Sequence, residues 1–242
     1  MLVKACLNGG RTRDEHPAVP ITSEEVAADA REARDAGAGA VHVHPRAKDG
    51  LETLDPGPCG EAVAAVREAC PGMPIGLTTG LWISPGGPDE RLRLVAGWDP
   101  IPDFASVNVG EDGWVELAAL LIERGIGVEA GLVDPDAAHE FLDSPVADRC
   151  LRVLVEVERI TPRAPVAVAA QVDTVLDASG LGLPRLHHGY GPETWEVILA
   201  GAARGHDVRV GLEDVLTLPD GRTATGNADL VVAAIKLVSA EP

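Results

Sequence analysis

The chain has 242 residues, of which 45% are hydrophobic and only 3% are aromatic. This length suits one large domain, and a core of Ala, Val, Leu and Ile is typical of parallel strands that helices cover on both faces. The formal net charge of −18 argues against non-specific binding to nucleic acid, although a local basic patch can still hold an anionic small molecule. We expect residues 1–242 to form one domain.

The sequence contains no apolar run long enough to span a bilayer, and its N-terminus lacks the layout of a signal peptide. We therefore expect a cytoplasmic protein with neither a membrane nor a nucleic acid as partner. The four cysteines are far apart and form no CxxC motif. In a cytoplasmic chain we expect them to be reduced thiols that pack in the core.

Short apolar strands alternate with amphipathic helices along the whole chain. The predicted strands cover residues 2–7, 40–44, 74–79, 104–109, 127–132, 151–157, 183–188 and 207–212. A helix follows each strand, and the first one opens on the capping box Thr22-Ser23-Glu24-Glu25. About eight strand–helix units predict a closed (β/α)₈ TIM barrel. A doubly wound open sheet is the alternative, weakened because no G-x-G-x-x-G motif follows the first strand.

Two histidines stand at the end of the second predicted strand, in the segment His42-Val43-His44-Pro45-Arg46. Because side chains alternate along a strand, His42 and His44 point the same way. Two imidazoles on one face at the mouth of a strand suit a metal ion with open coordination positions. Taken alone, the pair is equally compatible with polar core residues that bond to their neighbours.

A third ligand is predicted after the eighth strand, where Arg209, Gly211 and Glu213 fall on one face. Glu213 would complete a His₂Glu zinc site, and nitrogen and oxygen ligands favour zinc over manganese or another divalent ion. An open zinc position polarises a carbonyl oxygen and stabilises an enolate-like transition state. The alternative for Glu213 is an ion pair with Arg209.

Other polar residues are predicted at the C-terminal ends of the strands, where barrel enzymes carry their sites. Arg209 and Asp214 form a plausible base unit, because a carboxylate held by a guanidinium stays ionised and can accept a proton. A salt bridge at the barrel rim is the alternative. Thr78, Ser106 and Asn108 offer donors for a carboxylate or an oxyanion, or serve only as backbone caps.

Positive charge is predicted on one side of the barrel mouth, carried by Arg11, Arg13, Arg46 and Lys48. Such a patch suits a carboxylate or the phosphates of a nucleotide-like cofactor, and solvated loop charge is the alternative.

Glu129 is predicted at the end of the fifth strand. Of His187 and His188 on the seventh strand, we expect one in the pocket and the other between strand and helix.

With these residues identified, the chain resembles the β-keto acid cleavage enzymes, a family that includes the 3-keto-5-aminohexanoate cleavage enzyme. The resemblance runs almost from end to end, and its motifs are specific only in combination. They are Leu7-Asn8-Gly9-Gly10, His16-Pro17-Ala18-Val19-Pro20-Ile21-Thr22, His42-Val43-His44-Pro45-Arg46, Thr78-Thr79-Gly80, Ser106-Val107-Asn108-Val109-Gly110 and Arg209-Val210-Gly211-Leu212-Glu213-Asp214.

The resemblance implies a (β/α)₈ barrel, usually a homo-oligomer such as a dimer or tetramer, with one catalytic Zn²⁺ per subunit. Such enzymes condense a β-keto acid with acetyl-CoA and then cleave, yielding acetoacetate and a new CoA ester. By position, His42, His44 and Glu213 would be the zinc ligands. Arg209 and Asp214 would generate the reactive carbanion. The expected substrate contacts are Arg11, Arg46, Thr78, Ser106, Asn108 and Glu129.

The chain departs from the family pattern at three positions. Arg11 stands where the aminohexanoate enzyme has a glutamate that we take to contact the amine, which argues for an anionic or neutral side group on the substrate. Gly131 stands where that enzyme has a second acidic residue near the Arg209–Asp214 pair, so the support of this pair is expected to differ. Val215 stands where an asparagine often follows the Glu-Asp pair in the family.

Two other classes of protein remain as alternatives. A zinc hydrolase of the amidohydrolase kind also uses an HxH motif in a barrel. In such a hydrolase we would expect the motif on the first strand and a metal-binding aspartate on the last. A non-catalytic metal- or ligand-binding barrel is the third class, because the family glutamate is lost at Arg11.

Overall fold

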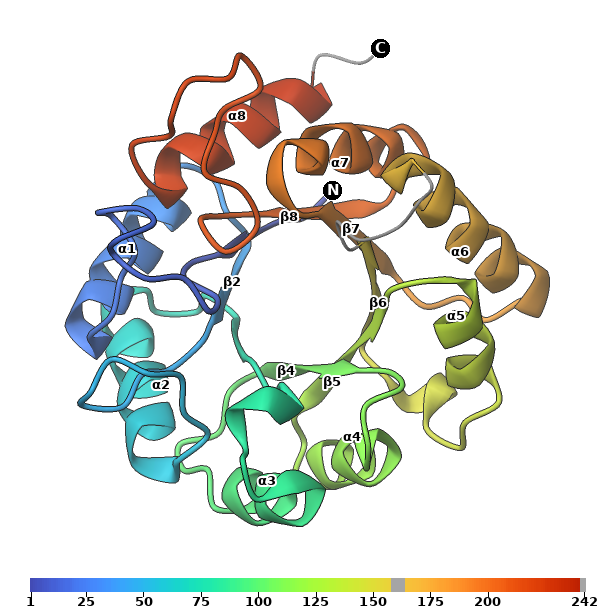
Figure 1. Ribbon diagram of the computed structural model, residues 1–242, viewed down its shortest axis with the longest axis horizontal. Helices are drawn as coiled ribbons and strands as arrows, with labels where there is room; N and C mark the ends of the chain where they lie inside the picture. Colours follow the sequence, from blue (N-terminus) through green and yellow to red (C-terminus); the bar gives the residue numbers. More distant parts are fainter. Residues whose placement is uncertain (158–163, 240–242) are drawn as a thin grey trace.

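The computed structural model describes residues 1–157 and 164–239, and its eight parallel strands form a closed ring (Figure 1). The strands are β1 (Val3–Cys6), β2 (Ala40–Val43), β3 (Ile75–Leu77), β4 (Phe104–Asn108), β5 (Gly127–Leu132), β6 (Arg152–Val157), β7 (Arg185–Gly189) and β8 (Asp207–Val210). Each strand pairs with the next in sequence, and β8 closes the ring by pairing with β1. The predicted (β/α)₈ barrel is confirmed, and the open doubly wound sheet is wrong.

Helices surround the strands as an outer ring (Figure 1). They are α1 (Ser23–Asp35), α2 (Pro56–Ala69), α3 (Gly87–Ala96), α4 (Trp114–Glu123), α5 (Pro135–Leu142), α6 (Pro165–Ser179), α7 (Thr194–Ala203) and α8 (Asn227–Ser239). The described part of the chain also forms the short 3₁₀ segments η1 (Leu81–Ile83), η2 (Ala147–Arg149) and η3 (Gly191–Glu193). Within residues 1–157 and 164–239, no helix has the length and apolar character needed to cross a membrane.

The predicted capping box starts α1. The Thr22 hydroxyl accepts a hydrogen bond from the Glu25 amide at 3.3 Å, and the Glu25 carboxylate accepts one from the Thr22 amide at 3.0 Å. Both bonds satisfy amides that a helix N-terminus leaves without partners. The buried face of α1 consists of Val26, Ala27, Ala30 and Ala33, at the spacing of a helical stripe. The cap and the stripe together set where α1 begins and which side packs on the barrel.

Strand β2 shows how alternation divides the barrel into an inner and an outer layer. Val41 and Val43 are fully buried and belong to the aliphatic core under the helices. His42 lies between them on the opposite face, which points to the barrel interior.

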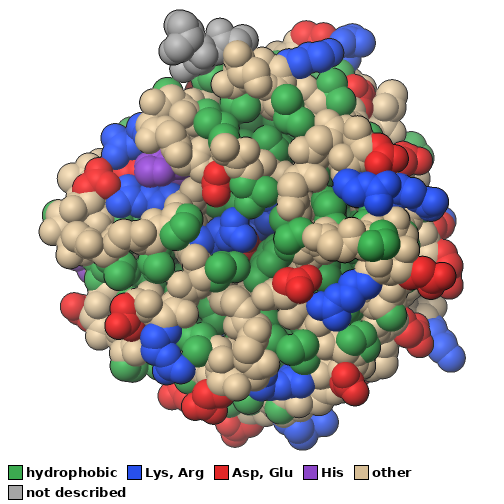
Figure 2. Space-filling model, turned by 180° about the vertical axis from the view of Figure 1, so that it is seen from behind, with side chains coloured by type: hydrophobic (Ala, Val, Ile, Leu, Met, Phe, Trp, Pro, Cys, Tyr) green, Lys and Arg blue, Asp and Glu red, His purple; other side chains and the backbone are tan. Residues whose placement is uncertain are grey.

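The four cysteines are free and buried, as predicted. Acidic and basic side chains are interspersed on the face of the molecule seen in Figure 2.

The N-terminal part of the barrel interior is held by a buried charge cluster. Lys4 Nζ lies 2.5 Å from Glu129 Oε2, and Arg152 Nε lies 3.2 Å from Glu129 Oε1. Both cations also lie over the Phe104 ring, at 5.4 and 5.7 Å from its centroid. The structure therefore does not place Glu129 at the substrate cavity, contrary to expectation. Both carboxylate oxygens of Glu129 face Lys4 and Arg152, and Glu129 is not among the residues that line the cavity.

Candidate metal and substrate site

A cavity of about 140 Å³ opens at the C-terminal ends of the strands. It is lined by Gly10, His42, His44, Thr78, Trp82, Ser106, Asn108, Glu156, Tyr190, Arg209 and Glu213. A larger groove of about 400 Å³ lies between α8 and the loop around Asp220, but none of the predicted site residues lines it. We therefore take the smaller, polar cavity as the candidate site.

Three side chains of this cavity converge on one point. His42 Nε2 lies 4.0 Å from Glu213 Oε2, and His44 Nε2 lies 3.6 Å from Glu213 Oε1. One nitrogen or oxygen atom from each of the three residues lies within 4.8 Å of the others. Ligands that sit about 2.1 Å from a zinc ion lie at comparable distances from one another. The structure thus brings together the three predicted metal ligands.

Unsatisfied polar atoms in this group fit a bound cation. Among the described residues, no hydrogen-bond donor reaches the buried Glu213 Oε2. Burial opposes ionisation of Glu213, but Arg209 and the imidazoles of His44 and His42 hold its pKa well below the usual range. Burial also lowers the pKa of His42, which keeps a lone pair available. A buried, ionised oxygen without a donor is costly, and a divalent ion would satisfy it.

Glu52 orients His44 from outside the metal group. Its Oε1 lies 2.5 Å from His44 Nδ1, and its Oε2 accepts a hydrogen bond from the Trp82 indole at 3.3 Å. A carboxylate behind a ligating imidazole fixes the ring and leaves Nε2 for the metal. Burial favours neutral His44, but Glu213 and Glu52 raise its pKa to about 9. A metal ion must therefore displace a proton from this ring.

Glu52 is not among the site residues predicted from the sequence. The residue reaches His44 because the loop after β2 reverses at Lys48-Asp49-Gly50 and pairs Arg46 with Glu52 in an antiparallel bridge. The Lys48-Asp49-Gly50 turn could have predicted the contact between Glu52 and His44, because it returns the chain toward the end of β2.

The loop after β1 supports both His44 and Glu213. Asn8 accepts a hydrogen bond from the His44 amide and donates one to the His44 carbonyl, both at 2.9 Å. Gly9 adopts φ +51°, and a Cβ there would lie 2.4 Å from Glu213 Cγ. Only glycine combines that left-handed backbone with so close an approach. The Asn8-Gly9 motif therefore positions two of the three candidate metal ligands.

Arg209 connects the metal group to Asp214. Its Nη2 lies 2.7 Å from Glu213 Oε1 and 2.6 Å from Asp214 Oδ1. Burial raises the pKa of Asp214, although Arg209 opposes this effect. Arg209 lines the cavity, whereas Asp214 is fully buried and does not. The predicted pair forms, but only its arginine reaches the cavity.

The predicted donors Thr78, Ser106 and Asn108 all line the cavity. The Thr78 hydroxyl accepts a hydrogen bond from the Gly80 amide at 3.3 Å, so it also serves as a backbone cap. The Asn108 amide group donates to Glu111 at 2.9 Å. Thr78 can therefore serve both as a backbone cap and as a donor to a ligand in the cavity, the two roles predicted from the sequence.

The structure does not bring Arg11 and Arg46 to the cavity lining. Arg46 donates to the carbonyls of Gly9 and Arg11, the latter at 3.0 Å. Arg11 donates to the Glu15 carboxylate at 2.8 Å and to the Glu213 carbonyl at 3.3 Å. Both guanidinium groups hold the loop after β1 and so support Glu213 indirectly.

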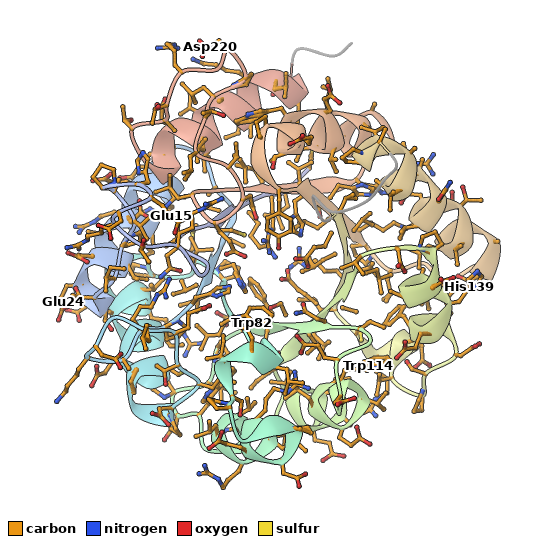
Figure 3. The ribbon with its side chains drawn as sticks, in the orientation of Figure 1. Glu15, Glu24, Trp82, Trp114, His139 and Asp220 are labelled. Carbon is orange, nitrogen blue, oxygen red and sulfur yellow. The ribbon has the colours of Figure 1, made fainter. Side chains whose placement is uncertain are left out.

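Two aromatic residues that sequence analysis missed line the cavity. Trp82, on η1, is 60% exposed and lies toward the barrel mouth (Figure 3). Tyr190 follows β7 and donates a hydrogen bond to Glu156. In a chain with only 3% aromatic residues and a single tyrosine, aromatic side chains just after two strands were a usable signal.

The chain matches the family of beta-keto acid cleavage enzymes over residues 1–241. The chain belongs to this family. Among curated relatives, the 3-keto-5-aminohexanoate cleavage enzyme of Fusobacterium nucleatum is 28% identical, over 98% of this chain and 90% of that protein. The enzyme of the same name from Acetoanaerobium sticklandii is 26% identical, over 98% of this chain and 91% of that protein. The resemblance predicted from sequence is confirmed.

Solved structures share the barrel fold of this β-keto acid cleavage enzyme family member. A ternary complex of ObcA with a C4-CoA adduct and oxalate has a TM-score of 0.74 and 19% identity, covering 91% of this chain. The chain spans only 63% of that ObcA chain. A type I 3-dehydroquinate dehydratase from Clostridium difficile has a TM-score of 0.64 and 12% identity, covering 99% of this chain and 93% of that one. At these identities the likeness establishes the fold alone.

Proposed function

We propose that this protein is a zinc-dependent enzyme that condenses a β-keto acid with acetyl-CoA and releases acetoacetate and a new acyl-CoA. The observation that carries the proposal is the convergence of His42, His44 and Glu213 on one point of a cavity, in a chain of the β-keto acid cleavage family. The ObcA complex with a C4-CoA adduct supports a CoA thioester as the second substrate. We further propose that the enzyme acts in the cytoplasm as a homo-oligomer.

His42, His44 and Glu213 would hold the zinc ion. When bound, the ion supplies a Lewis acid for a carbonyl oxygen in the cavity. Glu52 directs His44 Nε2 toward the ion, and Arg209 fixes the Glu213 carboxylate. These contacts preorganise the ligands before a substrate arrives.

Arg209 is the single arginine or lysine among the described residues that line the cavity. It is therefore the natural partner for the carboxylate of a β-keto acid, and Asp214 holds it in place. Thr78, Ser106 and Asn108 supply hydroxyl and amide donors for the developing oxyanion. Trp82 lies where it can exclude water from the occupied cavity.

The reaction breaks the C2–H bond of the keto acid, forms a bond from C2 to the acetyl carbonyl carbon and breaks the thioester C–S bond, so that CoA leaves as a thiolate. The CoA sulfur then attacks C3 of the keto acid, the C2–C3 bond breaks, the acyl group leaves as the new CoA thioester, and C2 takes back a proton. The acetyl carbons become C3 and C4 of acetoacetate. The Arg209–Asp214 pair, predicted from the sequence to remove this proton, would instead stabilise the charge on C2 after the proton has left, because Asp214 does not line the cavity.

The fate of the acetyl carbons tests this proposal. Zinc-loaded protein is incubated with acetyl-CoA carrying ¹³C in both acetyl carbons and with a panel of β-keto acids. The proposal predicts acetoacetate labelled at C3 and C4, together with unlabelled acyl-CoA. Unlabelled acetoacetate, or hydrolysis of acetyl-CoA without carbon–carbon bond formation, would contradict it.

A further inference from the structure

Glu156 is a second cavity-facing carboxylate besides Glu213, and it comes from β6. Its Oε2 occupies the space beside Gly131 on the neighbouring strand β5. A Cβ on Gly131 would lie 3.1 Å from Glu156 Oε2 and 3.2 Å from Asn108 Oδ1. The absence of a side chain at Gly131 thus lets Glu156 reach the cavity from the next strand.

His188 lies beside Glu156 and away from the cavity surface. The two residues are register partners on β6 and β7, so their side chains leave the sheet on the same side. His188 Nε2 lies 3.7 Å from Glu156 Oε2, and its Nδ1 lies 3.7 Å from Asp214 Oδ1. The ring is fully buried, and neither nitrogen has a closer hydrogen-bond partner among the described residues. Catalytic hydrogen bonds are often this long in structures without substrate and shorten in the substrate complex.

Glu156 is held in its ionised form. Burial raises the pKa of a carboxyl group, but His188, Arg209 and Tyr190 together lower the pKa of Glu156 to about 2. Such a carboxylate is always ready to receive a proton but cannot retain it at neutral pH. A proton that reaches Glu156 therefore needs a second acceptor close by, and the imidazole of His188 is the adjacent one.

We propose that Glu156 Oε2 removes the proton from C2 of the β-keto acid and passes it to His188 Nε2. Asp214 accepts the Nδ1–H of His188 and so keeps Nε2 free, which makes Asp214 a positioning residue in this step. The C2–H bond breaks, its electron pair stays on the substrate as the enolate, and the proton ends on His188. The resulting imidazolium lies between two carboxylates. This assignment rests on the proposed function and gives its proton-transfer step to a residue that touches the cavity.

Glu156→Gln keeps the shape of the side chain and an oxygen for Tyr190, but it cannot accept the proton. We expect kcat for acetoacetate release to fall about 10²–10⁴-fold, the usual contribution of a positioned base. Exchange of the C2 hydrogens with D₂O, measured by NMR without acetyl-CoA and corrected for the uncatalysed rate, should fall in parallel. KM for the keto acid and zinc content by mass spectrometry should stay within about threefold of the wild type.

His188→Gln should also lower kcat and hydrogen exchange, and His187→Gln is its matched control. His187 is the neighbouring residue on β7 and faces the helices rather than Asp214, so its variant should keep wild-type exchange. Glu156→Asp retains the carboxylate and should restore part of the exchange lost in Glu156→Gln. This rescue separates lost proton transfer from misfolding.

Wild-type exchange in Glu156→Gln, or a raised KM with unchanged kcat, overturns the inference while leaving the proposed function intact. Equal losses in the His187 and His188 variants overturn it as well. If the wild type produces no labelled acetoacetate from any β-keto acid, the proposed function fails, and this inference falls with it.

Discussion

Within residues 1–157 and 164–239, two groups of histidine and carboxylate side chains meet the distance requirements of a metal site. The rim group consists of His42, His44 and Glu213, at the C-terminal ends of β2 and β8. The outer group consists of Asp173, His187 and His206, where β7 meets α6 and the end of α7. In both groups the possible ligand atoms lie within 4.8 Å of one another.

The carboxylate of the outer group is already neutralised by arginines. Asp173 Oδ1 lies 2.9 Å from Arg185 Nη1, and Asp173 Oδ2 lies 3.0 Å from Arg204 Nε. The rings of His187 and His206 stack in parallel planes with centroids 4.9 Å apart. Two guanidinium groups beside the carboxylate repel a further cation, so this group fits a structural role.

The rim group differs in its charge balance and its access. Glu213 shares one arginine with Asp214 and faces a cavity, and its Oε2, like Asp173 Oδ2 of the outer group, accepts no hydrogen bond among the described residues. A further carboxylate, Glu52, stands behind His44. The comparison teaches that ligand type and spacing do not identify a metal centre by themselves. The surrounding charges and the opening to a cavity decide between the two groups.

Removing a rim ligand should have the largest effect. His44→Ala should lose bound zinc, and acetoacetate release should fall by about 10³-fold or more, the scale of losing a group that stabilises transition-state charge. Metal analysis and the acetoacetate assay measure both effects. His187→Ala, the corresponding change in the outer group, should keep its zinc and its activity. A metal-replete, active His44→Ala variant would remove the distinction between the groups.

Asp173→Asn tests the structural role of the outer group. The variant should unfold more easily by about 2–4 kcal/mol, because Arg185 and Arg204 lose the charge that compensates them. Urea denaturation of the zinc-loaded protein measures the change. Zinc content should be the same as in the wild type. A loss of zinc without a loss of stability would show that Asp173 binds metal.

Glu52→Gln should weaken zinc binding without abolishing it. The expected loss is about 10–100-fold in affinity, because the His44 ring loses the carboxylate that orients it. Competition with a chromophoric chelator gives the affinity. Asp177→Asn, which removes a carboxylate next to the outer group, is the control and should bind zinc as the wild type does. Equal affinity in Glu52→Gln and the wild type would exclude a supporting role for Glu52.

Asp29 is a carboxylate whose hydrogen-bond partner is neutral, unlike Glu213 and Asp173, which lie beside arginines. Asn227 Nδ2 donates to Asp29 Oδ2 at 2.6 Å, but burial raises the pKa of Asp29 from 3.8 to about 7. The folded protein therefore binds this proton more tightly than the unfolded chain. The resulting stability is fully present below about pH 4 and is lost as the pH rises through 7.

Asp29→Asn should remove this pH dependence. At pH 8 the variant should be more stable than the wild type by about 2 kcal/mol, after allowance for the partial exposure of Asp29. Below pH 4 the difference should vanish. Thermal unfolding across this pH range measures the effect. A variant less stable than the wild type at pH 8 would show that Asp29 is ionised and useful in the fold.

Arg11→Glu should have the smallest effect. Arg11 lies outside the cavity lining, so the reversal of charge should change substrate preference toward cationic β-keto acids by about tenfold at most, as a screened interaction does. The ratio of kcat/KM for cationic and neutral β-keto acids measures the preference. An unchanged ratio would show that Arg11 only holds the loop.

Local periodicity was enough to predict the barrel and the grouping of His42, His44 and Glu213. Alternation along β2 put His42 and His44 on one face, and the same rule placed Glu213 beyond β8. Depth within the barrel was not predictable in this way. Glu129 follows the alternation, but its carboxylate faces Lys4 from β1 and Arg152 from β6 instead of the cavity.

Contacts between segments far apart in the sequence explain the other omissions. Glu52 reaches His44 through a reversed loop, and Glu156 reaches the space beside Gly131 because β6 is the neighbour of β5. The burial of Asp214 beneath Arg209 likewise depends on packing after the barrel closes. The contacts of Glu52 and Glu156 and the burial of Asp214 could not be predicted from the position of each residue relative to the end of a strand.

A crystal structure of the zinc-loaded protein, with anomalous data collected on both sides of the zinc absorption edge, tests the central claim most directly. We expect one anomalous peak per chain, bonded to His42, His44 and Glu213, and no peak at the outer group. A peak beside Asp173, or a rim group without zinc in protein that contains one zinc per chain, would contradict it.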